Sequence, residues 1–166
     1  MIKRCCKITT AALLVLLATA FIFSNSMKDM EESREDSNVV VDVVEVVVEK
    51  IVPDHNIDVE HAVRKGAHIS EFALLGALSA LFYLTFEKRK RYALFFVFLY
   101  TALVASLDEF IQRFTGRGSQ FTDVLIDIFG AVLGITFMLL FAFLCGCILS
   151  RRRIKNNHSL IRRIKK

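Results

Sequence analysis

The chain has 166 residues, of which 54% are hydrophobic, and it carries 22 Lys and Arg against 17 Asp and Glu. Soluble domains contain about 45–50% apolar residues spread along the chain, whereas here they form long blocks separated by charged stretches. These blocks exclude a disordered protein and a disulfide-stapled miniprotein, and they argue strongly against a soluble enzyme.

Four apolar blocks predict membrane-spanning helices, at 8–23, 67–86, 92–107 and 124–149. A helix needs about 20 residues to cross about 30 Å of hydrocarbon, which the second and fourth blocks provide. The first can extend through Ser24 and Asn25, and the third through Asp108 to Phe114. The alternative is a soluble bundle of buried helices, but such helices are usually apolar on one side only. We therefore expect an all-α membrane protein with four transmembrane helices.

The basic residues predict how these helices are oriented. Of the 22 Lys and Arg, three lie in residues 1–7, four in the 86–92 connection and eight in the tail at 150–166. If all four blocks span, these segments share one side, which the positive-inside rule assigns to the cytoplasm. Both termini are then cytoplasmic, and 24–66 and 108–123 lie outside. The basic tail is expected to contact anionic lipid rather than nucleic acid.

The first block has a second interpretation. A basic start, an apolar run and the small residues Ala18-Thr19-Ala20 are also typical of a cleaved signal peptide. The other three spans keep their orientation under either interpretation.

The outer segment contains a valine-rich stretch at 39–52, with nine valines in fourteen residues. Valine favours strands, but Asp42, Glu45 and Glu49 are spaced by three and four residues, which places them on one side of a helix. We expect an amphipathic helix lying in the outer membrane interface, with Asp58 as the N-cap of the next helix.

Polar residues gather at the outer ends of the last three spans. Helical periodicity places Asp108 one turn from Gln112, and Asp123 one turn from Asp127. It also places Arg64, His68 and Glu71 of the second span within about 60° of each other. The three groups are Arg64, Lys65, His68 and Glu71, then Asp108, Glu109, Gln112 and Arg113, and then Arg117, Asp123 and Asp127.

Two glycines predict which way this polar face points. Gly130 and Gly134 continue the helix face of Asp123 and Asp127. A Gly-x-x-x-Gly spacing lets a neighbouring helix approach closely, so the carboxylate-bearing face is expected to pack inward. A charge one turn inside a span costs about 2.5–3.5 kcal/mol unless it is paired or hydrated. We expect basic residues at the same depth, Arg64, Lys65, Arg113 and Arg117, to offset Glu71 and Asp127.

Three interpretations of the cluster remain open. One is a structural ion-pair network. Another is a catalytic site, in which His68 or a carboxylate transfers protons and the basic residues bind a phosphate or carboxylate. The third is a metal site of His68 and Glu71 with Asp108, Asp123 or Asp127. Because His-x-x-Glu alone is a weak metal signal, we predict no metal and no other cofactor.

These residues carry a resemblance to a known family. The run at 63–72 resembles the Arg-Lys-x-x-His-x-x-Glu-aromatic signature of the VanZ-like family, with Arg64, Lys65, His68 and Glu71 in place. Asp-Glu-x-x-Gln at 108–112, Gly-Arg at 116–117 and Asp-x-x-x-Asp-x-x-Gly at 123–130 resemble its second signature. The Phe-Ser-Asn at 23–25 resembles the family's start, although the family commonly has Gln where this chain has Ser26.

The resemblance implies a small bacterial membrane protein of four or five spans, in a family associated with low-level resistance to the glycopeptide teicoplanin. It implies a multi-pass protein of the bacterial cytoplasmic membrane, with a VanZ-like domain at 8–149 and no assigned reaction. We expect a role in glycopeptide tolerance through an outward-facing site. The expected catalytic residues are His68, Glu71, Asp108 and Glu109, and the expected substrate-binding residues are Arg64, Lys65, Gln112, Arg117, Asp123 and Asp127.

Two mechanisms remain open for that role. The protein is either an enzyme of acid/base or hydrolytic chemistry on a lipid-linked envelope substrate, or a non-catalytic protein that binds or shields. A transporter is less favoured, because four short spans without a repeat do not suit alternating access. The expected partners are the bilayer and either a lipid-linked envelope precursor or the glycopeptide.

Overall fold

The computed structural model describes residues 2–28, 38, 40–46, 58–86, 91–115 and 120–164. Each of its four long helices contains a segment long and apolar enough to cross a membrane, and the described residues include no strand. The helices are α1 (Ile2–Ser26), α3 (Val59–Leu84), α4 (Arg91–Phe114) and α5 (Phe121–Ile164). An all-α protein with four candidate membrane spans is therefore confirmed.

The helices are longer than the apolar blocks that predicted them. α1 continues to Ser26 and α4 to Phe114, as the possible extensions indicated. α3 begins at Val59 rather than at residue 67, because Asp58 caps it by accepting a hydrogen bond from the His61 backbone N–H at 3.0 Å. This cap was expected. The polar motifs therefore lie on regular helices, where periodicity fixes their directions.

The valine-rich stretch is helical where the structure describes it. Residues 40–46 form a helix, which confirms the prediction of a helix rather than a strand over these residues. The other residues of the predicted helix, 39 and 47–52, lie outside the described residues. Its position in the membrane interface stays a prediction.

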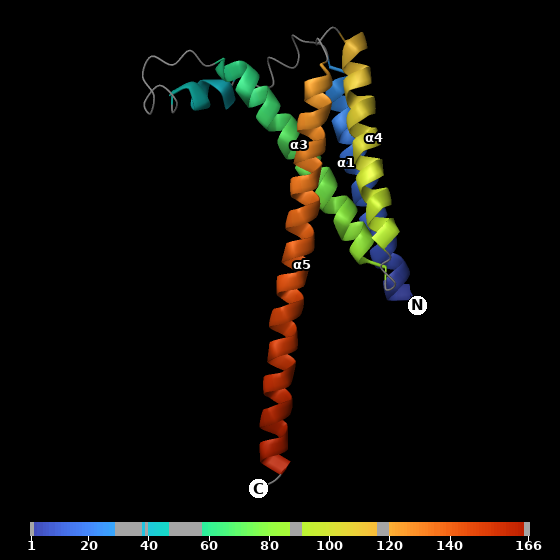
Figure 1. Ribbon diagram of the computed structural model, residues 1–166, viewed down its shortest axis with the longest axis vertical. Helices are drawn as coiled ribbons and strands as arrows, with labels where there is room; N and C mark the ends of the chain where they lie inside the picture. Colours follow the sequence, from blue (N-terminus) through green and yellow to red (C-terminus); the bar gives the residue numbers. More distant parts are fainter. Residues whose placement is uncertain are drawn as a thin grey trace.

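The bundle is organised around α3, which runs obliquely against α5, with α1 and α4 beside it (Figure 1). Glycines allow α3 and α5 to touch through their backbones. A Cβ on Gly130 would lie 2.6 Å from the Ile69 carbonyl oxygen, and one on Gly134 would overlap the Ala73 carbonyl. Gly76 of α3 makes the reciprocal contact with Ala131. The prediction that the glycine face of the last span packs inward is confirmed.

A small apolar core holds the four helices together below the polar cluster. It comprises Val15, Ile22, Phe72, Leu75, Val104, Ala105 and Ala131. Between α1 and α4, the hydroxyls of Thr19 and Tyr100 add a hydrogen bond at 2.7 Å. Many large apolar side chains point outward, among them Leu16 at 63% and Phe143 at 66% exposure. Such a surface fits lipid rather than water, and the chain is a multi-pass membrane protein.

Candidate functional site

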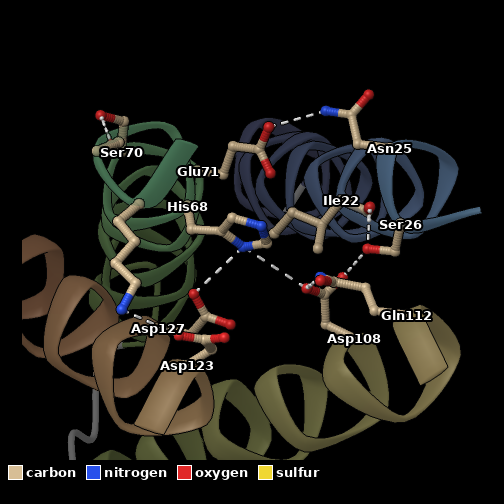
Figure 2. Close-up of polar contacts among 12 residues, drawn as sticks. Ile22, Asn25, Ser26, His68, Ser70, Glu71, Asp108, Gln112, Asp123 and Asp127 are labelled. Carbon is tan, nitrogen blue, oxygen red and sulfur yellow. Dashed lines mark hydrogen bonds and ion pairs between the residues drawn. The ribbon is translucent and has the colours of Figure 1, made fainter. Parts of the chain in front are cut away.

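Three helices bring His68, Asp108 and Asp127 to one point at the end of the bundle. His68 lies on α3, Asp108 on α4 and Asp127 on α5. His68 Nδ1 is 3.4 Å from Asp127 Oδ1 and 3.8 Å from Asp108 Oδ2 (Figure 2). Both carboxylates are completely buried, whereas the imidazole is 20% exposed. Two acids and a histidine from three separate helices therefore share one buried space.

The carboxylate of Asp108 is held by two donors on opposite sides. The Ser26 hydroxyl at the end of α1 donates to Oδ1, and Gln112 Nε2 donates to Oδ2 at 2.7 Å. Ser26 and Gln112 are themselves buried, at 2% and 6% exposure. Thr115 donates to the Ser26 carbonyl at 3.3 Å, which ties the ends of α1 and α4 together. Asp108 is therefore fixed in orientation.

Asp127, unlike Asp108, has no hydrogen-bond donor to its carboxylate among the described residues. Within the described part of the chain, neither of its carboxylate oxygens has a hydrogen-bond partner, and its ion pair is with His68 alone. His68 Nδ1 and Glu109 Oε2 are likewise buried without a hydrogen-bond partner among these residues. Leaving a buried polar atom unpaired costs about 1–3 kcal/mol, and more when it is charged. The cluster thus holds several polar atoms aimed at one space without satisfying one another.

A small pocket opens beside these atoms, with a volume of about 30 Å³. Because one water needs about 10–15 Å³ of such space, the pocket holds one or two waters or a single small ionic group. It is lined by His61, Arg64, Lys65, His68, Glu109, Gln112, Asp123, Ile126 and Asp127. Its wall therefore includes basic, acidic and imidazole side chains.

Two pairs of side chains mark the outer part of this pocket. Lys65 Nζ lies 3.5 Å from Asp123 Oδ1, and both side chains are about one-third exposed. Arg64 lies 3.4 Å from the Nδ1 of His61, on the same exposed turn of α3. The basic side chains among these pairs, Arg64 and Lys65, suit an anionic group.

The structure gathers most of the predicted site residues but pairs them differently from the expectation. Among the described residues, Asp127 pairs with His68, and Lys65 pairs with Asp123. Glu71 lies one turn along α3 from His68 and accepts a hydrogen bond from Asn25 Nδ2 at 2.8 Å. It therefore links α3 to α1 instead of entering the His68–Asp108–Asp127 cluster. Arg117 lies outside the described residues.

Two contributors from α1 were not predicted as site residues. Ser26 and Asn25 follow the apolar part of the first span, and the sequence indicated only that the helix extends through Asn25 and that residues 23–25 resemble the start of the VanZ-like family. The available signal was that polar side chains end a span at the same outer depth as the acidic motifs. Which acid each contacts depends on how α1 crosses α3 and α4, and helical periodicity does not give that crossing.

The site combines proton-transferring groups, oriented carboxylates and basic side chains at a membrane-helix end. Such a set can transfer protons, and its imidazole nitrogen and carboxylate oxygens are also ligands for divalent metals. No curated protein and no solved structure matches the chain. The family model described as VanZ/LLP1 matches residues 11–144, a range that covers the second and third spans completely, most of the first and fourth, and every residue of the cluster. The chain therefore belongs to the VanZ/LLP1 family.

Proposed function

We propose that this chain is a bacterial cell-envelope protein that performs acid/base chemistry on an anionic, lipid-linked envelope component. We further propose that this activity contributes to tolerance of teicoplanin-type glycopeptides, the phenotype that the family resemblance implies. The observation that carries the proposal is the set of buried, unsatisfied polar atoms around His68, Asp127 and Glu109.

A structural ion-pair network would look different. Buried polar networks that stabilise a fold are fully hydrogen-bonded, because each unpaired group raises the free energy of the folded state. Asp108 follows that rule through Ser26 and Gln112. Asp127 and Glu109 do not, since they have buried oxygens with no hydrogen-bond partner among the described residues. Groups kept at such a cost are typical of sites that act on a ligand.

The location of the site supports an envelope substrate. The positive-inside rule places the ends of α1, α3, α4 and α5 that carry the site on the outer side of the membrane. In that orientation the pocket would lie at the level of the lipid headgroups, so a lipid-linked molecule could present its charged group there without leaving the bilayer. Arg64 and Lys65, which line the pocket, suit a phosphate or carboxylate on that molecule.

The size of the pocket argues for altering an envelope component rather than capturing the antibiotic. A volume of about 30 Å³ admits one small charged group, whereas ligand pockets for drug-sized molecules measure about 300–1,000 Å³. A glycopeptide is larger still. The site therefore suits a chemical step at one group of a lipid-linked molecule.

The proposed roles follow from where each side chain lies. Glu109, with a free buried oxygen in the pocket wall, is the acid/base group, and His68 carries or orients the proton. Asp108, fixed by Ser26 and Gln112, orients the site. Arg64 and Lys65 contact the anionic group, and Asp123 positions Lys65.

The test is teicoplanin susceptibility of a sensitive Gram-positive host that expresses wild type, Glu109→Gln, Asp108→Asn or empty vector. Membrane levels are matched by immunoblot. Glu45→Gln is the control, because Glu45 is an exposed carboxylate outside the site. We expect protection by wild type and Glu45→Gln, and none by the two site variants. Protection by all variants would contradict a chemical role, and no protection by wild type would contradict the link to glycopeptides.

A further inference from the structure

Two sets of unsatisfied atoms, His68 Nδ1 and the Asp127 carboxylate oxygens, converge with an oxygen of Asp108 as ligands around a cation do. His68 Nδ1, one oxygen of Asp108 and one oxygen of Asp127 all lie within 4.8 Å of one another. In Figure 2 the two contacts of His68 diverge from the same ring nitrogen, one toward each carboxylate. The contact of 3.8 Å is too long for a hydrogen bond, and the contact of 3.4 Å lies at the long limit and leaves both atoms without a well-formed one.

These distances fit a metal ion better than direct contact. Ligands about 2.0–2.2 Å from a tetrahedral ion stand about 3.3–3.6 Å from one another. The His68–Asp127 separation of 3.4 Å lies in this range and the His68–Asp108 separation of 3.8 Å slightly above it. The third separation, between the two carboxylate oxygens, is at most 4.8 Å, so side-chain adjustments would be needed to bring all three atoms to one ion.

Burial and charge point to the same ligand. Asp127 is completely buried, and both of its oxygens have no hydrogen-bond donor within the described residues. Asp108 and Glu109 place two further carboxyl groups beside it, at 0% and 4% exposure. Acidic groups crowded at low dielectric repel one another, and a bound dication removes that repulsion. The ion would then be the missing partner of His68 Nδ1 and of the Asp127 carboxylate.

We propose that His68, Asp108 and Asp127 bind one divalent transition-metal ion such as Zn²⁺. An imidazole nitrogen among the ligands favours Zn²⁺ or a similar first-row ion over Mg²⁺ and Ca²⁺, which prefer oxygen. Three protein ligands leave a position open, and the pocket of about 30 Å³ has room for one or two waters there. This assignment replaces the prediction of no metal. It rests on the proposed function only for the chemical role of the ion.

Asp108 also has the outer contacts that a metal ligand needs. Ser26 and Gln112 hold its carboxylate from α1 and from one turn along α4. Hydrogen bonds to the ligands orient them, and losing such a bond typically weakens metal binding about 10- to 100-fold. Glu109 then stays free to transfer protons, because it is not one of the three ligands.

The test measures metal in the full chain purified in detergent. Wild type, Asp127→Asn and Asp123→Asn are analysed by inductively coupled plasma mass spectrometry, stripped with a chelator and titrated with Zn²⁺ alone. Asp123→Asn is the matched control, since it makes the same change one turn earlier on α5 at a residue that pairs with Lys65. We expect about one ion per chain and a Kd for Zn²⁺ that Asp127→Asn weakens at least about 100-fold.

Three results would overturn the site. One is the absence of saturable Zn²⁺ binding by stripped wild type, another is equal weakening by Asp123→Asn, and the third is unchanged binding by Asp127→Asn. If Asp127→Asn does not fold, Co²⁺ is added to stripped wild type. Visible absorption bands of a low-coordinate nitrogen–oxygen site would then support the proposal, and their absence would overturn it.

The same variants separate this inference from the proposed function. Wild type that protects the host but shows no saturable Zn²⁺ binding after stripping would overturn the metal site and leave the proposed function standing. Wild type that binds Zn²⁺ but does not alter teicoplanin susceptibility would support the metal site and contradict the proposed function.

Discussion

The hydroxyl of Ser26, at the last residue of α1, donates a hydrogen bond to the buried carboxylate of Asp108 on α4. The two residues are 82 positions apart in the chain, and both are at most 2% exposed. This contact makes α1 part of the site as well as part of the bundle. It also explains how a carboxylate can stay in place at the end of a membrane helix.

Replacing Ser26 by alanine should therefore destabilise the protein. Asp108 would lose one of its two donors, and an unpaired buried acceptor costs about 1–3 kcal/mol of unfolding free energy. Ser24→Ala is the control, because Ser24 lies on the same helix but is exposed. Thermal unfolding in detergent should show a lower midpoint for Ser26→Ala only. Equal midpoints for the two variants would show that the Ser26–Asp108 contact contributes no stability.

The contact between α3 and α5 should be equally sensitive to a single methyl group. A Cβ at Gly134 would overlap the Ala73 backbone, so Gly134→Ala must push the helices apart at a cost of about 1–3 kcal/mol. Gly146→Ala is the control, since a Cβ there meets no atom within 4 Å. We expect a lower unfolding midpoint and weaker teicoplanin protection for Gly134→Ala alone. A midpoint for Gly134→Ala as high as that for Gly146→Ala would be inconsistent with the close helix contact.

The predicted orientation can be read from cysteine labelling in intact cells. The four native cysteines are first replaced by serine, and single cysteines are then introduced at His61 and at Lys88. His61 is exposed beside the pocket, and Lys88 lies in the basic 86–92 connection. By the positive-inside rule, a membrane-impermeant maleimide should label His61→Cys only. Labelling of Lys88→Cys only would invert the topology and place the site in the cytoplasm.

Much of the fold followed from patterns that are local in the sequence. The lengths of the apolar blocks predicted four spans, and Asp58 predicted the start of α3. The spacing of Gly130 and Gly134 predicted which face of α5 packs inward. Asp127, Gly130 and Gly134 are spaced by three and four residues, which places them on one face of a helix. Those features depend on the geometry of a single helix, which does not change with how the helix packs against its neighbours.

The pairing inside the site did not follow from the sequence in the same way. Charge alone favoured arginine and lysine as partners of Asp127, whereas the structure places His68 beside it. The sequence grouped Glu71 with His68, but the structure turns Glu71 toward Asn25 on α1. Partners across helices depend on crossing angles and relative depth. These are set by the glycine contacts and the apolar core together, and no short motif encodes them.

Under the proposed function, the buried acids are kept for activity at a cost in stability, and Asp127→Asn tests this most directly. The measurement compares the unfolding midpoint of chelator-treated variant and wild type in detergent, with teicoplanin susceptibility measured on the same pair. Because Asp127 has no hydrogen-bond donor among the described residues, a neutral amide of the same shape should be buried more easily than the carboxylate. We predict an unchanged or higher midpoint together with complete loss of protection. A midpoint several degrees lower with protection retained would instead make Asp127 a structural residue and contradict the account.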